Sequence, residues 1–235
     1  MLIGNNQEGS IDHIFTGPPA PLTSLALSPD GKTLFAGCWD KRIWSWAVST
    51  RAKGKRYVGG HTDFVKCVLC VRVAGKDVLI SGGADAALVV WDVETGSRLH
   101  TLRSHIRGIQ DLALDPLTYD PSTEQVTIFS AGSVGEIRRW DISITHATEI
   151  EKEKPIMVHE TSVYKLLFDG DGDLWSASAD GSVNCLGRER GKGWEVEMSV
   201  EVGGWVRGVG IEDVGGWVVA GGRDERVGVW SIGVS

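Results

Sequence analysis

Two cysteines have the spacing of a metal-binding or redox pair. Cys67 and Cys70 form a C-x-x-C motif, whose two thiolates could bind zinc or exchange with a disulfide. A zinc site would need further ligands, and the remaining cysteines, Cys38 and Cys185, stand alone in the sequence. Cys67 and Cys70 also lie in an apolar run typical of a strand, where residues three apart face opposite sides. We therefore expect core thiols, and neither a metal site nor a cofactor.

Three histidines, His61, His105 and His159, are candidate general bases by residue type alone. Asp85 and Asp180 are candidate acids, but each sits at a tight turn followed by small residues, which favours a role as a turn-fixing acceptor. No serine lies in a G-x-S-x-G elbow, and no glycine-rich phosphate loop is present. A hydrolase would need a convergent nucleophile, metal or carboxylate cluster, so we expect no enzyme and no small-molecule substrate.

The charge of the chain restricts its partners. A net charge of −7 argues against general affinity for nucleic acid or anionic lipid, which require a basic surface. No run approaches the ~18 apolar residues of a membrane span, and the N-terminus lacks the basic and apolar parts of a secretory signal. We expect an intracellular protein, cytoplasmic or nuclear, that binds neither a membrane nor, directly, a nucleic acid.

The elements that position these residues recur along the chain. Trp46, Trp91, Trp140 and Trp230 occupy matching places, with Leu186 in the fourth of five slots, at intervals of 44 to 49 residues. A period of this length indicates one small unit repeated, each copy too small to bury its own apolar face.

The second copy shows the content of the unit. Residues 64–73, 78–82 and 87–91 are rich in Val, Leu and Ile and are separated by Gly, Ala and Asp turns, which predicts three strands. A fourth strand, RLHTLRSH, leads into the next copy. Helical periodicity is absent from the sequence, so we predict an all-β chain.

The order Gly-His, strand, Ser, turn Asp and Trp-Asp resembles the WD-repeat β-propeller family, from about residue 11 onward. The resemblance implies four-stranded blades that close radially around a channel. It also implies a hydrogen-bonded relay of His, Ser or Thr, Asp and Trp within a blade. The second repeat matches all four positions, with His61, Ser81, Asp85 and Trp91. The third keeps His105, Ser130 and Trp140, and the fourth keeps His159, Ser176 and Asp180.

The remaining positions depart from the relay pattern. The third repeat has Val134 at the Asp position, and the fourth has Leu186 for Trp. The first keeps only Asp40 and Trp46, and the fifth only Asp224 and Trp230. Because an unpartnered buried member would cost about 1–3 kcal/mol, we expect the second and third blades to be the most rigid.

The strand inventory suggests how the ring closes. Residues 11–15 look like the linking strand of a copy that lacks its other strands, while the last copy ends soon after Trp230. The expected fold is therefore a propeller of five four-stranded antiparallel blades, with the N-terminal strand closing the last blade. The alternative is a piece of a larger propeller. A tail (1–10) would precede one domain (11–235), with repeats at about 18–58, 59–102, 103–156, 157–201 and 202–235.

The resemblance also implies a docking face for partner peptides. In the family, residues three and five places beyond the His, and one before the turn Asp, point to that face. Carried over to this chain, the aromatic and cationic residues at these positions are Trp39, Phe64, Lys66, Tyr164, Trp205, Arg207 and Arg223. Aromatic side chains and Arg dominate interface energetics, so we expect a surface for acidic or phosphorylated segments. The alternative is that Trp39 and Trp205 pack between blades.

The expected function is a non-catalytic protein–protein interaction scaffold of an intracellular multiprotein complex. Its partners would be other proteins or their peptide segments. One alternative is a substrate receptor of a ubiquitin ligase that recognises an acidic or phosphorylated motif. Another is an RNA-associated ribosome-assembly factor, for which one broad basic face would be expected.

Overall fold

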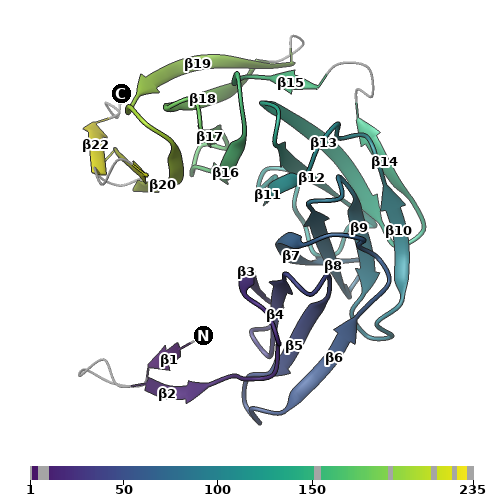
Figure 1. Cartoon of the computed structure of the whole chain (residues 1–235). Coiled ribbons are helices and arrows are strands. Elements are labelled where there is room, and N and C mark those ends of the chain that lie inside the picture. Colours follow the sequence, from purple (N-terminus) through teal and green to yellow (C-terminus); the bar gives the residue numbers. More distant parts are fainter. Residues whose placement is uncertain are drawn as a thin grey trace.

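The fold is a series of five antiparallel sheets, each formed by strands that are consecutive in the sequence. The structure, a computed structural model, describes residues 2–4, 11–150, 155–189, 193–212, 216–223 and 227–231. Every regular element in these ranges is a strand, and none of the described residues lies in a helix able to cross a membrane. Figure 1 shows the five sheets following one another along an arc. The all-β prediction and the five repeated units are confirmed.

Each blade is built from strands in chain order. The first blade contains β3 (Leu22–Leu27), β4 (Thr33–Cys38), β5 (Ile43–Ala47) and β6 (Lys53–Tyr57). The second contains β7 (Val65–Val73), β8 (Lys76–Gly83), β9 (Leu88–Asp92) and β10 (Arg98–Leu102). The third contains β11 (Ile109–Leu114), β12 (Gln125–Gly132), β13 (Glu136–Ser143) and β14 (Ala147–Ile150), with β15 (Ile156–Met157) as an additional partner of β13. The fourth contains β16 (Val163–Phe168), β17 (Leu174–Ser178), β18 (Ser182–Glu189) and β19 (Gly193–Glu201). The fifth contains β20 (Val206–Glu212), β21 (Trp217–Gly222) and β22 (Val227–Ser231).

The hydrophobic core lies between neighbouring blades. Alternation along each strand turns one set of side chains toward the preceding blade and the other set toward the following blade. Phe35 of β4 belongs to one buried cluster with Val68 and Cys70 of β7, for example, and Phe129 of β12 to another with Leu166 of β16. Each internal blade is therefore covered by its two neighbours and not by its own side chains.

Each first strand carries a β-bulge at the same place. The register shifts between Leu22 and Ser24 in β3, and matching shifts occur in β7, β11, β16 and β20. Just beyond the bulge, an N–H on the open edge of the strand reaches the preceding blade. The Val68 N–H donates to Ser24 Oγ at 3.1 Å, and the Leu166 N–H donates to Asp111 Oδ2 at 2.9 Å. Blades are thus joined by hydrogen bonds as well as by apolar packing.

The predicted closure of the last blade by residues 11–15 is wrong. β2 (Ile11–Ile14) pairs with β1 (Leu2–Gly4) instead of β22, and the last blade has three strands among the described residues. Two contacts hold the N-terminal segment at the first blade. Phe15 packs on Trp46 with ring centroids 5.9 Å apart, and the Trp46 indole donates to the Thr16 carbonyl at 3.3 Å.

The two ends of the arc lie apart in Figure 1. The first and last blades are at opposite ends, and the β1–β2 hairpin extends from the first. Packing between neighbouring blades sets the rotation from one blade to the next. Among the described residues β22 does not pair with β2, and the described blades form an open arc.

Candidate functional site

The second blade contains a complete hydrogen-bonded relay. His61 Nε2 lies 2.8 Å from Ser81 Oγ, and His61 Nδ1 lies 3.0 Å from Asp85 Oδ1. The Trp91 indole donates to Ser81 Oγ at 2.9 Å. Ser81 Oγ thus joins the imidazole to the indole, and Asp85 holds the other ring nitrogen.

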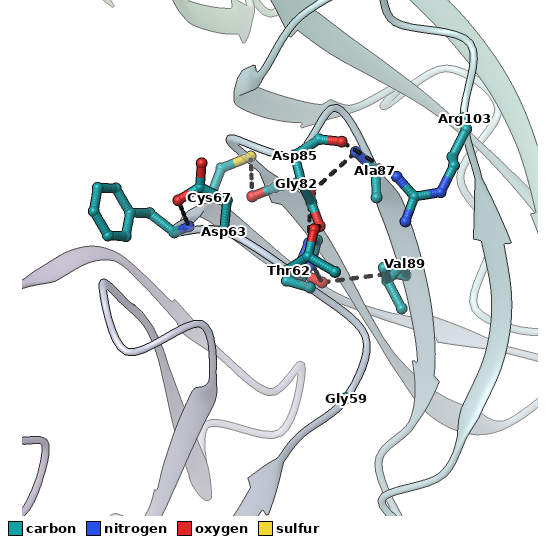
Figure 2. A network of polar contacts seen from close by, with 12 residues as sticks. Gly59, Thr62, Asp63, Cys67, Gly82, Asp85, Ala87, Val89 and Arg103 are labelled. Atoms are coloured by element: carbon teal, nitrogen blue, oxygen red, sulfur yellow. Dashed lines mark hydrogen bonds and ion pairs between the residues drawn. The ribbon is translucent and has the colours of Figure 1, made fainter.

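Asp85 also fixes the surrounding backbone (Figure 2). Its carboxylate accepts from the N–H groups of Thr62 at 2.7 Å and Ala87 at 3.2 Å, and its carbonyl accepts from the Arg103 guanidinium at 3.3 Å. Burial by itself would raise the pKa of Asp85, but the hydrogen bonds from His61 and the backbone outweigh it and lower the pKa to about 2. A charged carboxylate with this many partners is a structural group.

The third blade has a relay whose acid the sequence did not identify. His105 Nε2 and the Trp140 indole both reach Ser130 Oγ, at 2.6 and 2.7 Å. The acid is Glu136, with Oε1 2.7 Å from His105 Nδ1, although Val134 occupies the family's Asp position. Glu136 stands two residues later, and its longer side chain reaches back to the histidine. The sequence shows only that an acidic residue follows the turn glycine Gly135, which does not by itself assign Glu136 to the relay.

Glu136 is part of a buried charge network as well. Its Oε2 accepts from Arg138 Nε at 2.9 Å, and Arg138 also pairs with Glu149 of the outer strand β14. All three side chains are buried. The network links the relay to the outer edge of the blade.

The fourth blade keeps its relay without the tryptophan. His159 Nε2 lies 2.8 Å from Ser176 Oγ, and Nδ1 lies 3.1 Å from Asp180 Oδ2 and 3.0 Å from Ser182 Oγ. Burial lowers the pKa of His159 despite the neighbouring Asp180, so the imidazole is neutral at pH 7.

A second substitution accompanies Leu186. In the second blade a Cβ added at Gly60 would overlap the ring of Trp91. In the fourth blade Val158 takes the place of that glycine, and Val158 and Leu186 belong to the same apolar cluster. A larger neighbour therefore fills the space that the smaller Leu186 leaves.

The first and last blades lack the relay histidine. In the first, Trp46 donates to Thr16, and Asp40 accepts from the Trp44 indole at 2.9 Å. In the last, Trp230 packs against the cluster shared with the fourth blade, and Asp224 lies outside the described residues.

The cysteines are protonated core thiols. Cys38, Cys67, Cys70 and Cys185 are all free and buried. Burial raises the pKa of each thiol, to about 12 for Cys70 and Cys185. A metal ligand would need the thiolate, so this environment opposes metal binding at the C-x-x-C pair.

One described cluster has the composition of a cation site. Potential ligand atoms of Asp169, Asp173 and Cys185 lie within 4.8 Å of one another. Asp169 already accepts from the Trp175 indole at 2.7 Å and from the N–H of Asp173 at 2.8 Å. Burial raises the pKa of Asp173. The position of the two aspartates is therefore better explained by their hydrogen bonds in the turn between β16 and β17 than by a cation site.

The proposed docking residues lie at one repeated edge of the blades. In every blade, the N–H of the residue before the turn donates to a carbonyl at or just before the start of the first strand, at 2.8–3.0 Å. The donors are Trp39, Ala84, Ser133, Ala179 and Arg223, and the acceptors are Pro21, Phe64, Gly108, Ser162 and Trp205. The positions carried over from the family are therefore equivalent in space, even in the two blades that lack the histidine.

An aromatic stack forms between the first two blades. The rings of Trp39 and Phe64 are stacked with centroids 4.8 Å apart and planes inclined by 12°. Trp39 is 45% exposed, so it is not packed away between the blades. Lys66, two residues beyond Phe64, is half-buried.

A second group lies at the last two blades. The Arg207 guanidinium lies 5.2 Å from the centre of the Tyr164 ring, and that of Arg223 lies 4.9 Å from Trp205. Trp205 is 41% exposed. We call Tyr164, Trp205, Arg207 and Arg223 the cationic aromatic group. Because the arc is open, this group and the Trp39–Phe64 stack lie on blades at its opposite ends instead of forming one continuous surface.

Comparison with known proteins agrees with the repeat. Residues 9–47 match the family described as WD domain, G-beta repeat. Residues 55–168 match the tRNA methyltransferase TRM82 WD40 domain. The chain belongs to the WD-repeat family.

Similar proteins are longer than this chain. An uncharacterized WD repeat-containing protein of Schizosaccharomyces pombe is 36% identical over 178 residues, which cover 72% of this chain and 45% of that protein. Nuclear distribution protein nudF of Emericella nidulans is 32% identical, covering 73% of this chain and 36% of its own length. Pre-mRNA-processing factor 19 of Mus musculus is 27% identical, covering 53% and 23%. The matched region thus spans less than half of each of these relatives.

Proposed function

We propose that this WD-repeat protein is a non-catalytic scaffold inside the cell that binds acidic or phosphorylated segments of other proteins. The observation that carries the proposal is the cationic aromatic group, where two guanidinium groups lie over two aromatic rings. The exposed Trp205 and the half-buried Tyr164 supply contact area, and Arg offers paired donors to carboxylate or phosphate oxygens. The ring contacts hold both guanidinium groups in place before a ligand arrives.

The relay histidines and their acids support a non-catalytic role. The three relay histidines are buried, and each is hydrogen-bonded to a hydroxyl and to an acid of its own blade. Both ring nitrogens of each histidine are therefore occupied by hydrogen bonds that fix the turns of the blade. The Trp39–Phe64 stack provides a second, uncharged contact surface at the other end of the arc, suited to apolar or aromatic side chains of the same or another partner.

A second candidate function is favoured by one comparison. Because residues 55–168 match the tRNA methyltransferase TRM82 WD40 domain, the chain could serve as the WD-repeat part of a tRNA methyltransferase. Its net charge of −7 favours contact with a protein partner over direct contact with tRNA.

The test compares two arginine variants with a matched control. Arg207→Ala and Arg223→Ala each remove one guanidinium of the group. Arg56→Ala removes a guanidinium that lies 5.4 Å from the Trp44 ring centre at the outer strand of the first blade. Proteins retained from native extract would be quantified by mass spectrometry for each variant.

We expect both group variants to lose a partner that Arg56→Ala retains. A peptide from that partner, with and without its phosphate or acidic residues, should bind about tenfold more weakly to the variants. Unchanged retention by both variants would contradict the proposal. Co-purification of a methyltransferase subunit, undiminished in the variants, would favour the second candidate.

A further inference from the structure

The fourth blade contains an acidic pocket beside its relay. The pocket has a volume of about 500 Å³, and its lining includes the carboxylates of Glu160, Asp180 and Glu201 and the amide of Asn184. It lies beside β19, the outermost strand of the blade (Figure 1). No lysine or arginine is among the described residues that line it. Three acids thus surround a space to which these residues bring no cationic side chain.

The pocket combines exposed acids with a buried amide. Glu160 and Glu201 are exposed, whereas Asn184 is only 5% exposed. Asn184 Nδ2 donates to the Val158 carbonyl at 2.8 Å, which fixes the orientation of the amide, since a carbonyl oxygen can only accept. Asn184 Oδ1 is buried without a hydrogen-bond partner among the described residues. A buried acceptor without a donor is costly, so this amide points to a missing hydrogen-bond donor.

The equivalent place in the third blade holds a guanidinium group. Arg138 lies opposite the relay serine of its blade, as Asn184 does in the fourth blade. The Arg138 guanidinium lies 2.8 Å from Glu136 Oε2 and also pairs with Glu149 of the outer strand. The third blade therefore supplies two acids and the cation between them from its own chain.

The fourth blade keeps an acid on its outer strand but not the cation. Glu201 belongs to the outer strand β19, as Glu149 belongs to β14. Asn184 is shorter than Arg138 and carries no charge. The pocket is thus the space in which the third blade holds a guanidinium, with acids still beside it.

Asp180 supplies charge to the pocket but no free acceptor. Its Oδ1 accepts from the Ser182 N–H at 3.0 Å and from Ser182 Oγ at 2.7 Å. Its Oδ2 accepts from the Glu160 N–H at 3.1 Å and lies 3.1 Å from His159 Nδ1. Burial by itself would raise the pKa of Asp180, but the hydrogen bonds from Ser182 outweigh it and lower the pKa, so the carboxylate is charged at pH 7.

We propose that this pocket binds the guanidinium group of an arginine side chain of a partner protein. The acceptors available to it are the carboxylates of Glu160 and Glu201 and the Oδ1 of Asn184. A planar guanidinium carries five N–H donors in a fixed arrangement and reaches several acceptors at once. A calcium ion would need six to eight oxygen ligands, more than these side chains offer. The pocket is opposite in charge to the cationic aromatic group, so the two sites would bind different segments.

The test uses the whole chain, labelled with nitrogen-15, and short capped peptides that differ only in their central residue. That residue is arginine, lysine or citrulline, which has nearly the shape of arginine without its charge. NMR signals of the Asn184 side-chain amide report binding at the pocket. We expect the arginine peptide to shift these signals with a dissociation constant of about 1 mM, and the other two peptides to bind about tenfold more weakly.

Three variants connect the binding to the pocket. Glu201→Gln removes one carboxylate at nearly constant shape and should weaken binding of the arginine peptide about tenfold. Glu195→Gln is the matched control and should leave binding unchanged, because Glu195 is an exposed acid of the same strand outside the pocket. Asn184→Arg places a guanidinium there from the chain itself, as in the third blade, and should abolish binding while the chain stays folded.

Three results would overturn the proposal. One is an arginine peptide that leaves the Asn184 signals unmoved. Another is a citrulline or lysine peptide that binds as tightly as the arginine peptide, since the pocket would then not select a guanidinium. The third is equal weakening by Glu201→Gln and Glu195→Gln, and this comparison decides should Asn184→Arg not fold.

Discussion

Glu136 has two functions, of which the second blade needs only one. It is the acid of the relay through His105, and it is also the counter-ion of the buried Arg138. In the second blade Asp85 serves the histidine, and Val89 occupies the place of Arg138. The third blade thus contains a buried charge whose compensation depends on this one glutamate together with Glu149.

Glu136→Ala should lower the free energy of unfolding by about 3 kcal/mol, because it leaves Arg138 buried with one partner removed. His105 would lose its acid in the same variant. Urea unfolding measures the change, and Glu124→Ala, at an exposed position, is the control. A loss no larger than that of the control would show that the network contributes little.

His159 makes a residue-scale contribution to pH dependence. Burial lowers its pKa below the ordinary value of 6.5, so below that pH the unfolded chain binds more protons than the folded chain. The stability of the unaltered protein should therefore fall as the pH drops from 7 to about 5.5. His159→Gln should be less stable at pH 7 but should show a shallower fall over this range. Parallel curves in chemical unfolding would contradict the expectation.

Residue-level prediction succeeded where the family pattern is complete and stopped where this chain departs from it. His61, Ser81, Asp85 and Trp91 meet as the resemblance to the family implied. Glu136 could not be assigned, because the reach of a side chain from a neighbouring position depends on backbone geometry that spacing does not contain. The exchange of Gly60 for Val158 beside Leu186 is likewise visible only once the two residues are seen to pack together.

At the scale of elements, the bulged first strand is the part that connects blades. Asp111 shows the connection most clearly, since its Oδ2 accepts the Leu166 N–H at 2.9 Å and the Lys165 ammonium at 2.8 Å. The strand content of each blade was predictable because alternation and turn residues are local signals. The bulges were not predicted, as their one-residue shift leaves no mark in composition.

Asp111→Ala should cost about 1–3 kcal/mol of unfolding free energy by leaving the Leu166 N–H without an acceptor. Hydrogen exchange of the Leu166 amide should accelerate at the same time. Lys165→Ala is the control, because it removes the half-exposed ion pair, worth about 0.5 kcal/mol, and keeps the N–H bond. Unchanged exchange at Leu166 in Asp111→Ala would show that the bond does not secure the contact between blades.

At the scale of the whole molecule, the arc is the sum of four contacts between blades. Each contact could be anticipated from the repeat, since each blade needs a neighbour to cover its apolar faces. Closure of the ring could not be anticipated in the same way. It depends on the rotations accumulated over all four contacts and on the length of the N-terminal segment. The residues proposed for docking lie at the equivalent positions that the family pattern implied, but their separation into two groups follows from the open shape.

The four buried thiols have a practical consequence for such an array. Cys38 lies in the first blade, Cys67 and Cys70 in the second, and Cys185 in the fourth. A protonated, enclosed sulfur reacts with an alkylating reagent only when its surroundings open. The rate at which each cysteine is modified therefore reports local opening at a known point along the arc. The native sequence already carries the probes needed to learn whether the array frays from an end or opens in the middle.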